Sequence, residues 1–99
     1  MPPADRADRL SRSVTIVNLR GLHARAAARF VVAAERFATP VDVSKGGEIV
    51  SARSIMGLMM LGAGRGATIL LEADADGWDA QQALDALASL VESGFDEEE

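Results

Sequence analysis

The amino-acid sequence predicts an α+β fold, a two-layer open-faced sandwich with the element order β-α-β-β-α-β-α. Apolar residues recur at helical spacing in three segments, which indicates three amphipathic helices. Four further runs are β-branched or apolar, and a glycine pair joins two of them as a hairpin. Because each helix must bury its apolar stripe against a sheet, two layers accommodate all of these elements.

The first half of the chain supplies a strand, a helix and a hairpin. Residues 13–18 are rich in β-branched side chains and predict the first strand. Apolar residues recur at helical spacing over 27–37 and predict a helix that Pro40 stops. Residues 41–44 alternate apolar and polar side chains, and 48–50 follow Gly46-Gly47, so two strands joined by a tight turn are expected.

The second half supplies a short helix, a strand and a longer helix. Residues 54–61 predict the short helix, and the glycine-rich stretch 62–66 connects it to the apolar run 67–71. That run predicts a central, well-buried strand. Asp76 is expected to cap the last helix, which Gly94 ends.

Length and composition limit the organisation of the chain. Its 99 residues fit one domain, expected over 13–95, between a mobile N-terminal arm, 1–12, and an acidic C-terminal tail, 96–99. No segment resembles a signal peptide, and no apolar run approaches the roughly 20 residues that span a bilayer, so a cytoplasmic protein without membrane insertion is expected.

Charge and residue usage exclude several classes of site. The chain has no cysteine and one histidine, so we expect no disulfide, no metal site and no cofactor. The net charge of −5 makes a nucleic-acid partner improbable. The glycine-rich stretch 62–66 follows a helix and opens a strand, which is the reverse of a dinucleotide-binding loop.

The single histidine, His23, precedes the first predicted helix in the run Gly21-Leu22-His23-Ala24-Arg25. An imidazole at this solvent-facing helix end meets unpaired backbone N–H groups, those of Ala24 and Arg25, and the positive end of the helix dipole. Both disfavour the imidazolium and attract an anion, and the guanidinium of Arg25 matches the oxygens of a phosphoryl group. His23 is therefore a candidate phosphoryl carrier.

A second segment, Ser54-Ile55-Met56-Gly57-Leu58-Met59, begins 31 positions after the histidine. Together the two segments resemble those of HPr, the phosphocarrier family of the bacterial phosphoenolpyruvate-dependent phosphotransferase system, over residues 13–91. The chain departs from the family at Ala26, where proline is usual. Because alanine is the best interior helix former, the helix should survive, while the transfer rate and the choice of partner are open.

The resemblance implies an antiparallel sheet in the spatial order 1-4-2-3 with all helices on one face. It also implies a monomeric carrier, not an enzyme, that takes a phosphoryl group on Nδ1 of His23 from a phosphoenolpyruvate-charged first enzyme. The carrier then passes the group to a sugar-specific or regulatory second component, and Arg25 neutralises charge during the transfer.

Ser54 is expected to cap the short helix, and the resemblance adds phosphorylation by an ATP-dependent serine kinase, with a phosphorylase to reverse it. The resemblance also assigns an exposed docking face to Ile55, Met56 and Met59. Three arginines, Arg25, Arg29 and Arg36, fall near one stripe of the preceding helix, as either a solvated face or a docking surface for acidic partners.

Two alternatives to sugar transport remain open. One is a regulatory carrier of the same fold that signals nitrogen or carbon status. The other is a binding module in which Ser54 is the only modified residue and His23 merely caps a helix.

Overall fold

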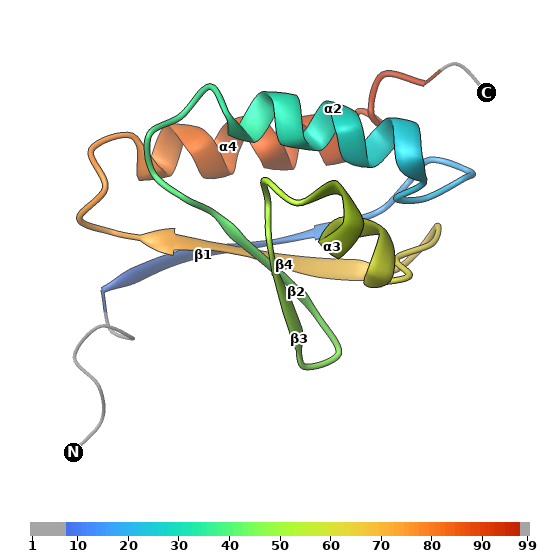
Figure 1. Ribbon diagram of the computed structural model, residues 1–99, viewed down its shortest axis with the longest axis horizontal. Helices are drawn as coiled ribbons and strands as arrows, with labels where there is room; N and C mark the ends of the chain where they lie inside the picture. The colour runs from blue at the N-terminus through green and yellow to red at the C-terminus, as the bar shows by residue number, and fades with distance from the viewer. Residues whose placement is uncertain (1–7, 98–99) are drawn as a thin grey trace.

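The computed structural model describes residues 8–97 and has the predicted element order, β-α-β-β-α-β-α (Figure 1). In the labels of Figure 1 the elements are β1 Arg9–Thr15, α2 Ala24–Ala34, β2 Asp42–Lys45, β3 Glu48–Ser51, α3 Ile55–Met60, β4 Thr68–Asp74 and α4 Ala80–Glu92.

The four strands form one antiparallel sheet in the order β1-β4-β2-β3, which confirms the predicted topology. The three helices cover one face, with α2 and α4 side by side (Figure 1). The central position predicted for β4 is confirmed, but only alternate residues of the strand are buried, Ile69, Leu71 and Ala73. The expectation that the whole run is well buried was wrong, because the second face of the sheet carries no helix.

The first strand begins earlier than predicted. Residues 9–12, which we expected in the mobile arm, pair with β4 from Arg9 opposite Asp74 onward. The guanidinium of Arg9 donates hydrogen bonds to Asp42 at 2.9 Å and Asp74 at 3.1 Å, while the neighbouring Leu10 packs against the core. Ion pairs across the open face thus sustain a strand in which apolar residues are sparse. Residues 1–7 of the predicted arm lie outside the described residues.

The predicted capping of α4 by Asp76 was wrong. The helix begins at Ala80, and Asp79 occupies the position before it without capping it. The carboxylate of Asp79 instead accepts hydrogen bonds from the backbone N–H groups of Ala38 and Thr39, at 2.8 and 3.1 Å, and from the Thr39 hydroxyl at 2.5 Å. We call this set of bonds the aspartate latch. It joins the loop after α2 to the loop before α4.

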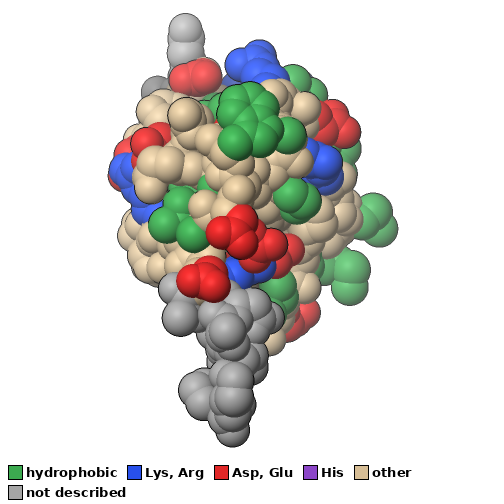
Figure 2. Space-filling model, turned by 90° about the vertical axis from the view of Figure 1, so that its left-hand side faces the viewer, with side chains coloured by type: hydrophobic (Ala, Val, Ile, Leu, Met, Phe, Trp, Pro, Cys, Tyr) green, Lys and Arg blue, Asp and Glu red, His purple; other side chains and the backbone are tan. Residues whose placement is uncertain are grey.

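Figure 2 looks onto the latched end of the molecule, where acidic, basic and hydrophobic side chains are interspersed. The helix α2 also ends at Ala34, before the predicted stop at Pro40, and residues 35–39 continue in turns toward the latch. The core lies between the sheet and the helices and includes Phe30 of α2, Leu84 and Leu87 of α4 and Leu58 of α3.

Candidate functional site

Four segments meet at the end of the molecule opposite the latch, on the right of Figure 1. They are the first turn of α2, the loop 16–22, the connector 61–67 and residues 94–97, which we call the C-terminal segment. The Leu22 N–H donates to the Ala63 carbonyl at 2.9 Å, and the Gly66 N–H donates to the Ile16 carbonyl at 2.8 Å. These backbone bonds fix the loop that leads into α2.

Gly21 is required where the loop crosses the connector. Its φ is +66°, and a Cβ on this residue would lie 2.5 Å from the carbonyl oxygen of Ala63 and 2.8 Å from Cα of Gly64. Only glycine meets both the left-handed backbone and the close approach. The turn places Leu22 in the core and His23 at the start of α2.

His23 is the N-cap residue of α2, with φ −75° and ψ 178°. Its Nδ1 accepts a hydrogen bond from the backbone N–H of Arg25 at 3.3 Å, and its carbonyl accepts one from the Ala27 N–H at 2.8 Å. An imidazole nitrogen that accepts a hydrogen bond carries a lone pair, so the ring proton belongs on Nε2. The predicted placement of the histidine at a helix start is confirmed.

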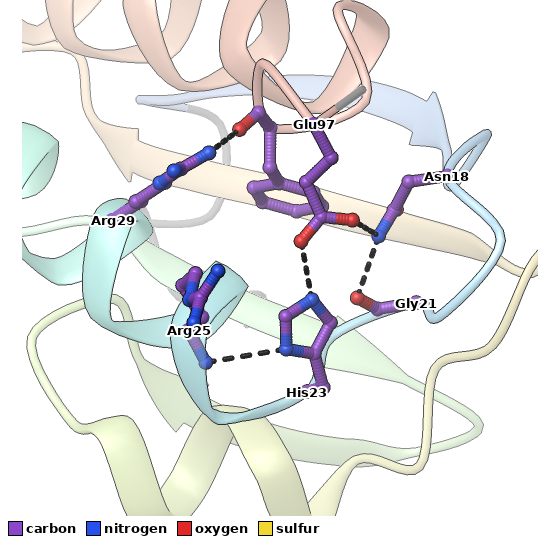
Figure 3. Close-up of polar contacts among 7 residues, drawn as sticks. Asn18, Gly21, His23, Arg25, Arg29 and Glu97 are labelled. Atoms are coloured by element: carbon purple, nitrogen blue, oxygen red, sulfur yellow. Dashed lines mark hydrogen bonds and ion pairs between the residues drawn. The ribbon is translucent and has the colours of Figure 1, made fainter. Parts of the chain in front are cut away.

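A carboxylate that the sequence reasoning missed lies against the other ring nitrogen (Figure 3). Nε2 of His23 donates to Oε2 of Glu97, whose Oε1 accepts a hydrogen bond from Nδ2 of Asn18 at 2.9 Å. The Asn18 bond and the His23 bond hold the pKa of Glu97 below its usual value, against the opposing effect of burial. The carboxylate is therefore ionised at neutral pH.

Little of the imidazole is exposed to solvent, and Glu97 lies against its Nε2 atom. The side chain of His23 keeps 15% of its exposed area, so the expected solvent-facing imidazole is largely shielded. The ring thus lies between the N terminus of α2 on the Nδ1 side and the carboxylate of Glu97 on the Nε2 side.

Asn18 connects the carboxylate of Glu97 to the turn at Gly21. It is almost fully buried, and its second Nδ2 hydrogen bonds to the Gly21 carbonyl at 2.9 Å. Both amide protons are used, which fixes the orientation of the amide, while Oδ1 is buried without a hydrogen-bond partner among the described residues. One side chain thus holds both the Gly21 turn and Glu97.

The C-terminal segment is held over α2 by Phe95. The chain leaves α4 in a Schellman motif, in which the Phe95 N–H bonds to the Leu90 carbonyl at 2.9 Å and the Gly94 N–H to the Val91 carbonyl at 3.0 Å. The Phe95 ring is fully buried, 6.5 Å from that of Phe30.

The guanidinium of Arg29 donates to the carbonyl of Phe95 (Figure 3). Arg29, expected among the docking residues, therefore also fastens this segment to α2. The sequence offered one signal for the arrangement: a phenylalanine directly after the helix-ending Gly94 needs a place in the core and pulls the chain back.

The other predicted arginines remain available. Arg25 is exposed, and neither it nor Arg36 forms an ion pair with any residue of 8–97. Both line a groove of about 390 Å³ between α2 and α4, together with Arg29 and the apolar side chains of Val32 and Leu90. The arginine stripe predicted for this helix thus borders a partly apolar groove.

The second predicted segment forms α3. The hydroxyl of Ser54 accepts a hydrogen bond from the Gly57 N–H at 2.9 Å, which confirms the predicted N-cap. Ile55, Met56 and Met59 are 40%, 70% and 41% exposed, whereas Leu58 is fully buried. The short helix therefore presents an apolar face to solvent next to α2.

Comparison with known proteins agrees with this arrangement. The family described as "PTS HPr component phosphorylation site" matches residues 10–93. The phosphocarrier protein HPr of Cupriavidus necator is 49% identical over 90 residues, which cover 91% of this chain and 99% of that protein.

Two solved structures are similar. The crystal structure of HPr from Thermoanaerobacter tengcongensis superposes with a TM-score of 0.83 at 42% identity, covering 91% of this chain and 99% of that one. The solution structure of Crh, described as the catabolite repression HPr of Bacillus subtilis, has a TM-score of 0.60 at 43% identity, covering 83% and 95%.

Two further observations concern the part of the chain that the structure describes. None of its helices is long and apolar enough to cross a membrane. Between residues 8 and 97, no group of three acidic, histidine or cysteine side chains converges on a point that could hold a metal ion.

From its motifs, its fold and these relatives, the chain belongs to the HPr family and is a phosphoryl carrier of the phosphotransferase system, not an enzyme.

Proposed function

We propose that His23 accepts the phosphoryl group on Nδ1, from a phosphoenolpyruvate-charged first enzyme, and passes it to a second component. The observation that carries the proposal is the pairing of the two ring nitrogens. Nδ1 accepts a hydrogen bond from the backbone N–H of Arg25, and Nε2 donates one to Glu97. The lone pair therefore lies on Nδ1, at the N terminus of α2. A neutral imidazole with its lone pair directed there is a nucleophile beside an anion site.

The first turn of α2 supplies the groups that would hold the phosphate. The backbone N–H groups of Ala24 and Arg25 belong to the first residues of the helix, where intrahelical acceptors are absent. The exposed guanidinium of Arg25 can approach the phosphoryl oxygens with two parallel donors. Together they replace the hydrogen bonds that water makes to a free phosphate, and the guanidinium adds a positive charge.

The docking surface in this proposal is the apolar face of α3 beside the positive face of α2. Ile55, Met56 and Met59 would be covered on binding, and flexible methionines can repack for the first enzyme and then for the second component. Arg25 and Arg36 favour acidic partners through charge complementarity. We place these exchanges in the cytoplasm, the compartment of phosphoenolpyruvate.

A regulatory role is the second candidate, because Ser54 caps α3 within this docking surface and one similar structure is that of a catabolite repression HPr. A phosphate on Ser54 would sit at a helix start and add about two negative charges there. The addition would weaken the docking of acidic partners. Phosphorylation of Ser54 would then hinder phosphorylation of His23, because transfer to His23 requires the first enzyme to dock on this surface.

Incubation with phosphoenolpyruvate and a first enzyme from the same cell tests the proposal. His23 is the only histidine, so a gain of acid-labile phosphate reports on one site. We expect the wild type and Ser54→Ala to be labelled and His23→Ala to remain unlabelled while folded. Labelling of His23→Ala would refute the assignment. An acid-stable phosphate formed only with ATP and a serine kinase would favour the binding module controlled by Ser54.

A further inference from the structure

We propose that Glu97 is a positioning residue for phosphoryl transfer, whose carboxylate holds the ring proton of His23 on Nε2 and so keeps the Nδ1 lone pair available. The inference rests on the proposed function, since it concerns the same histidine. It assigns a role to Glu97, which was expected in the acidic tail, 96–99.

The two partners of the ring are compatible with one tautomer. With the proton on Nε2, the ring donates to Glu97 and accepts from the Arg25 N–H at 3.3 Å. With the proton on Nδ1, an N–H would face the Arg25 N–H and a lone pair would face a carboxylate, so both contacts would be repulsive. Glu97 therefore selects the nucleophilic nitrogen.

The carboxylate is itself held in place by a side chain that cannot turn. Asn18 is almost fully buried and uses one Nδ2 hydrogen for Glu97 and the other for the Gly21 carbonyl, both at 2.9 Å. If the amide were flipped, its oxygen would oppose the carbonyl of Gly21. Glu97 Oε1 thus has a fixed donor, which leaves Oε2 directed at the ring.

The backbone that carries Glu97 is strained. Phe95 and Asp96 both have φ of +58°, a left-handed conformation that is unfavourable for residues with a Cβ. The conformation persists because the Phe95 ring is buried and Arg29 binds its carbonyl. Strain of this kind is retained where the surrounding structure over-determines it, and here the result is that Glu97 lies over the imidazole.

The transfer step explains what the carboxylate does. The Nδ1 lone pair forms the N–P bond, the bond from phosphorus to the donor atom breaks, and its electron pair leaves with that donor. The ring keeps its Nε2 proton and becomes a phosphorylated imidazolium, whose positive charge faces Glu97. When the group moves on, the N–P electrons return to Nδ1 and the ring is neutral again. The carboxylate stabilises the charge that appears and holds the proton throughout.

The single histidine makes the tautomer directly measurable. In ¹⁵N NMR of the imidazole, we expect Nδ1 of the wild type to be unprotonated and Nε2 to carry the proton. In Glu97→Gln the ring proton should move to Nδ1. The amide oxygen of the glutamine must face Asn18, so the NH₂ group of the glutamine donates to Nε2. Asp96→Asn is the matched control: it removes the same charge from the adjacent, exposed residue, and asparagine tolerates a positive φ.

Transfer kinetics with the first enzyme give the second measurement. For Glu97→Gln we expect kcat to fall about tenfold or more, the loss of one charge-assisted hydrogen bond in the transition state, with KM little changed. The kcat of Glu97→Ala should fall less, because water then replaces the carboxylate and a histidine in water favours the proton on Nε2. Asp96→Asn should keep the wild-type spectrum. Thermal melts establish that each variant is folded.

The order of the three proteins decides the matter. A positioning role is supported if kcat is highest for the wild type, lower for Glu97→Ala and lowest for Glu97→Gln, and if the ring proton of Glu97→Gln lies on Nδ1. An unchanged tautomer in Glu97→Gln, or a larger loss in Glu97→Ala, would overturn it and leave Glu97 as a tie for the chain end. Failure of the wild type to accept phosphate would refute the proposed function instead, and the NMR comparison would still test the contact.

Discussion

Replacement of Gly21 by alanine should damage the domain and its active loop together. The new methyl group would lie 2.5 Å from the Ala63 carbonyl oxygen, and the residue would keep φ at +66°. A left-handed alanine costs about 1–2 kcal/mol and overpacking against backbone about 1–3 kcal/mol, so we expect a loss of about 2–5 kcal/mol. A domain of this size has about 5–15 kcal/mol in total, and the melting temperature should fall by at least about 10 °C.

Other glycines separate the two contributions. Gly46 has φ +57° with nothing within 4 Å of an added Cβ, so Gly46→Ala should cost only the backbone term of about 1–2 kcal/mol. Gly64 has neither a positive φ nor a nearby atom, and Gly64→Ala should be neutral or stabilising by up to about 1 kcal/mol. Thermal and urea melts of the three variants measure these differences.

The substitution of Gly21 should also affect His23, which follows it in the same loop. Because Gly21 leads into the histidine and its carbonyl binds Asn18, phosphoryl acceptance of Gly21→Ala should fall even at temperatures where the variant is folded. A melting temperature of Gly21→Ala within about 2 °C of that of Gly46→Ala would refute the clash, since the backbone term alone would then explain the loss.

Three further predictions concern single side chains. Arg25→Lys should keep its charge but slow phosphoryl transfer, since an ammonium cannot make the planar two-point contact of a guanidinium; rapid-quench kinetics equal to wild type would make the arginine a bystander. Ser54→Asp should weaken docking to the first enzyme without unfolding the domain, because aspartate is also a good N-cap; titration calorimetry with parallel melts separates the two effects, and equal affinity would remove α3 from the interface. The bond from the Thr39 hydroxyl, with those from two backbone N–H groups, holds the pKa of Asp79 below its usual value. The folded pKa is then lower than the unfolded one, so the stabilisation is present above the unfolded pKa and is lost as the pH falls through the folded pKa. In melts across pH, the gap between wild type and Asp79→Asn should be wide near neutrality and close in acid, and a gap independent of pH would contradict the assignment.

The sequence predicted the elements where apolar periodicity is strong and missed those that ion pairs sustain. The stripe of α2 and the hairpin at Gly46-Gly47 stand out in the sequence, and both are present. The start of β1 does not stand out, because Arg9 is held there by Asp42 and Asp74, residues 33 and 65 positions away. Such pairings exist only after the sheet has formed.

The site was predictable in part for the same reason. His23 and Ser54 each follow from a local rule, the residue that precedes a helix, and the structure places both as N-caps. Glu97 and Asn18 follow no local rule, since they are 79 positions apart and their meeting depends on Phe95 turning the chain back. A run of acidic residues after a helix is ordinarily solvated, so composition gave no signal for the contact between Glu97 and His23.

The aspartate latch lies at the end of the molecule opposite His23, and the hydrogen bonds of Asp79 link it to the loop at 38 and 39, away from the loops around the histidine. Sites that share no partner contribute to stability additively. Destabilising changes near His23 can therefore be offset by changes at the latch without altering the chemistry. The fold can vary the residues that choose its partners while the far end maintains the folded state.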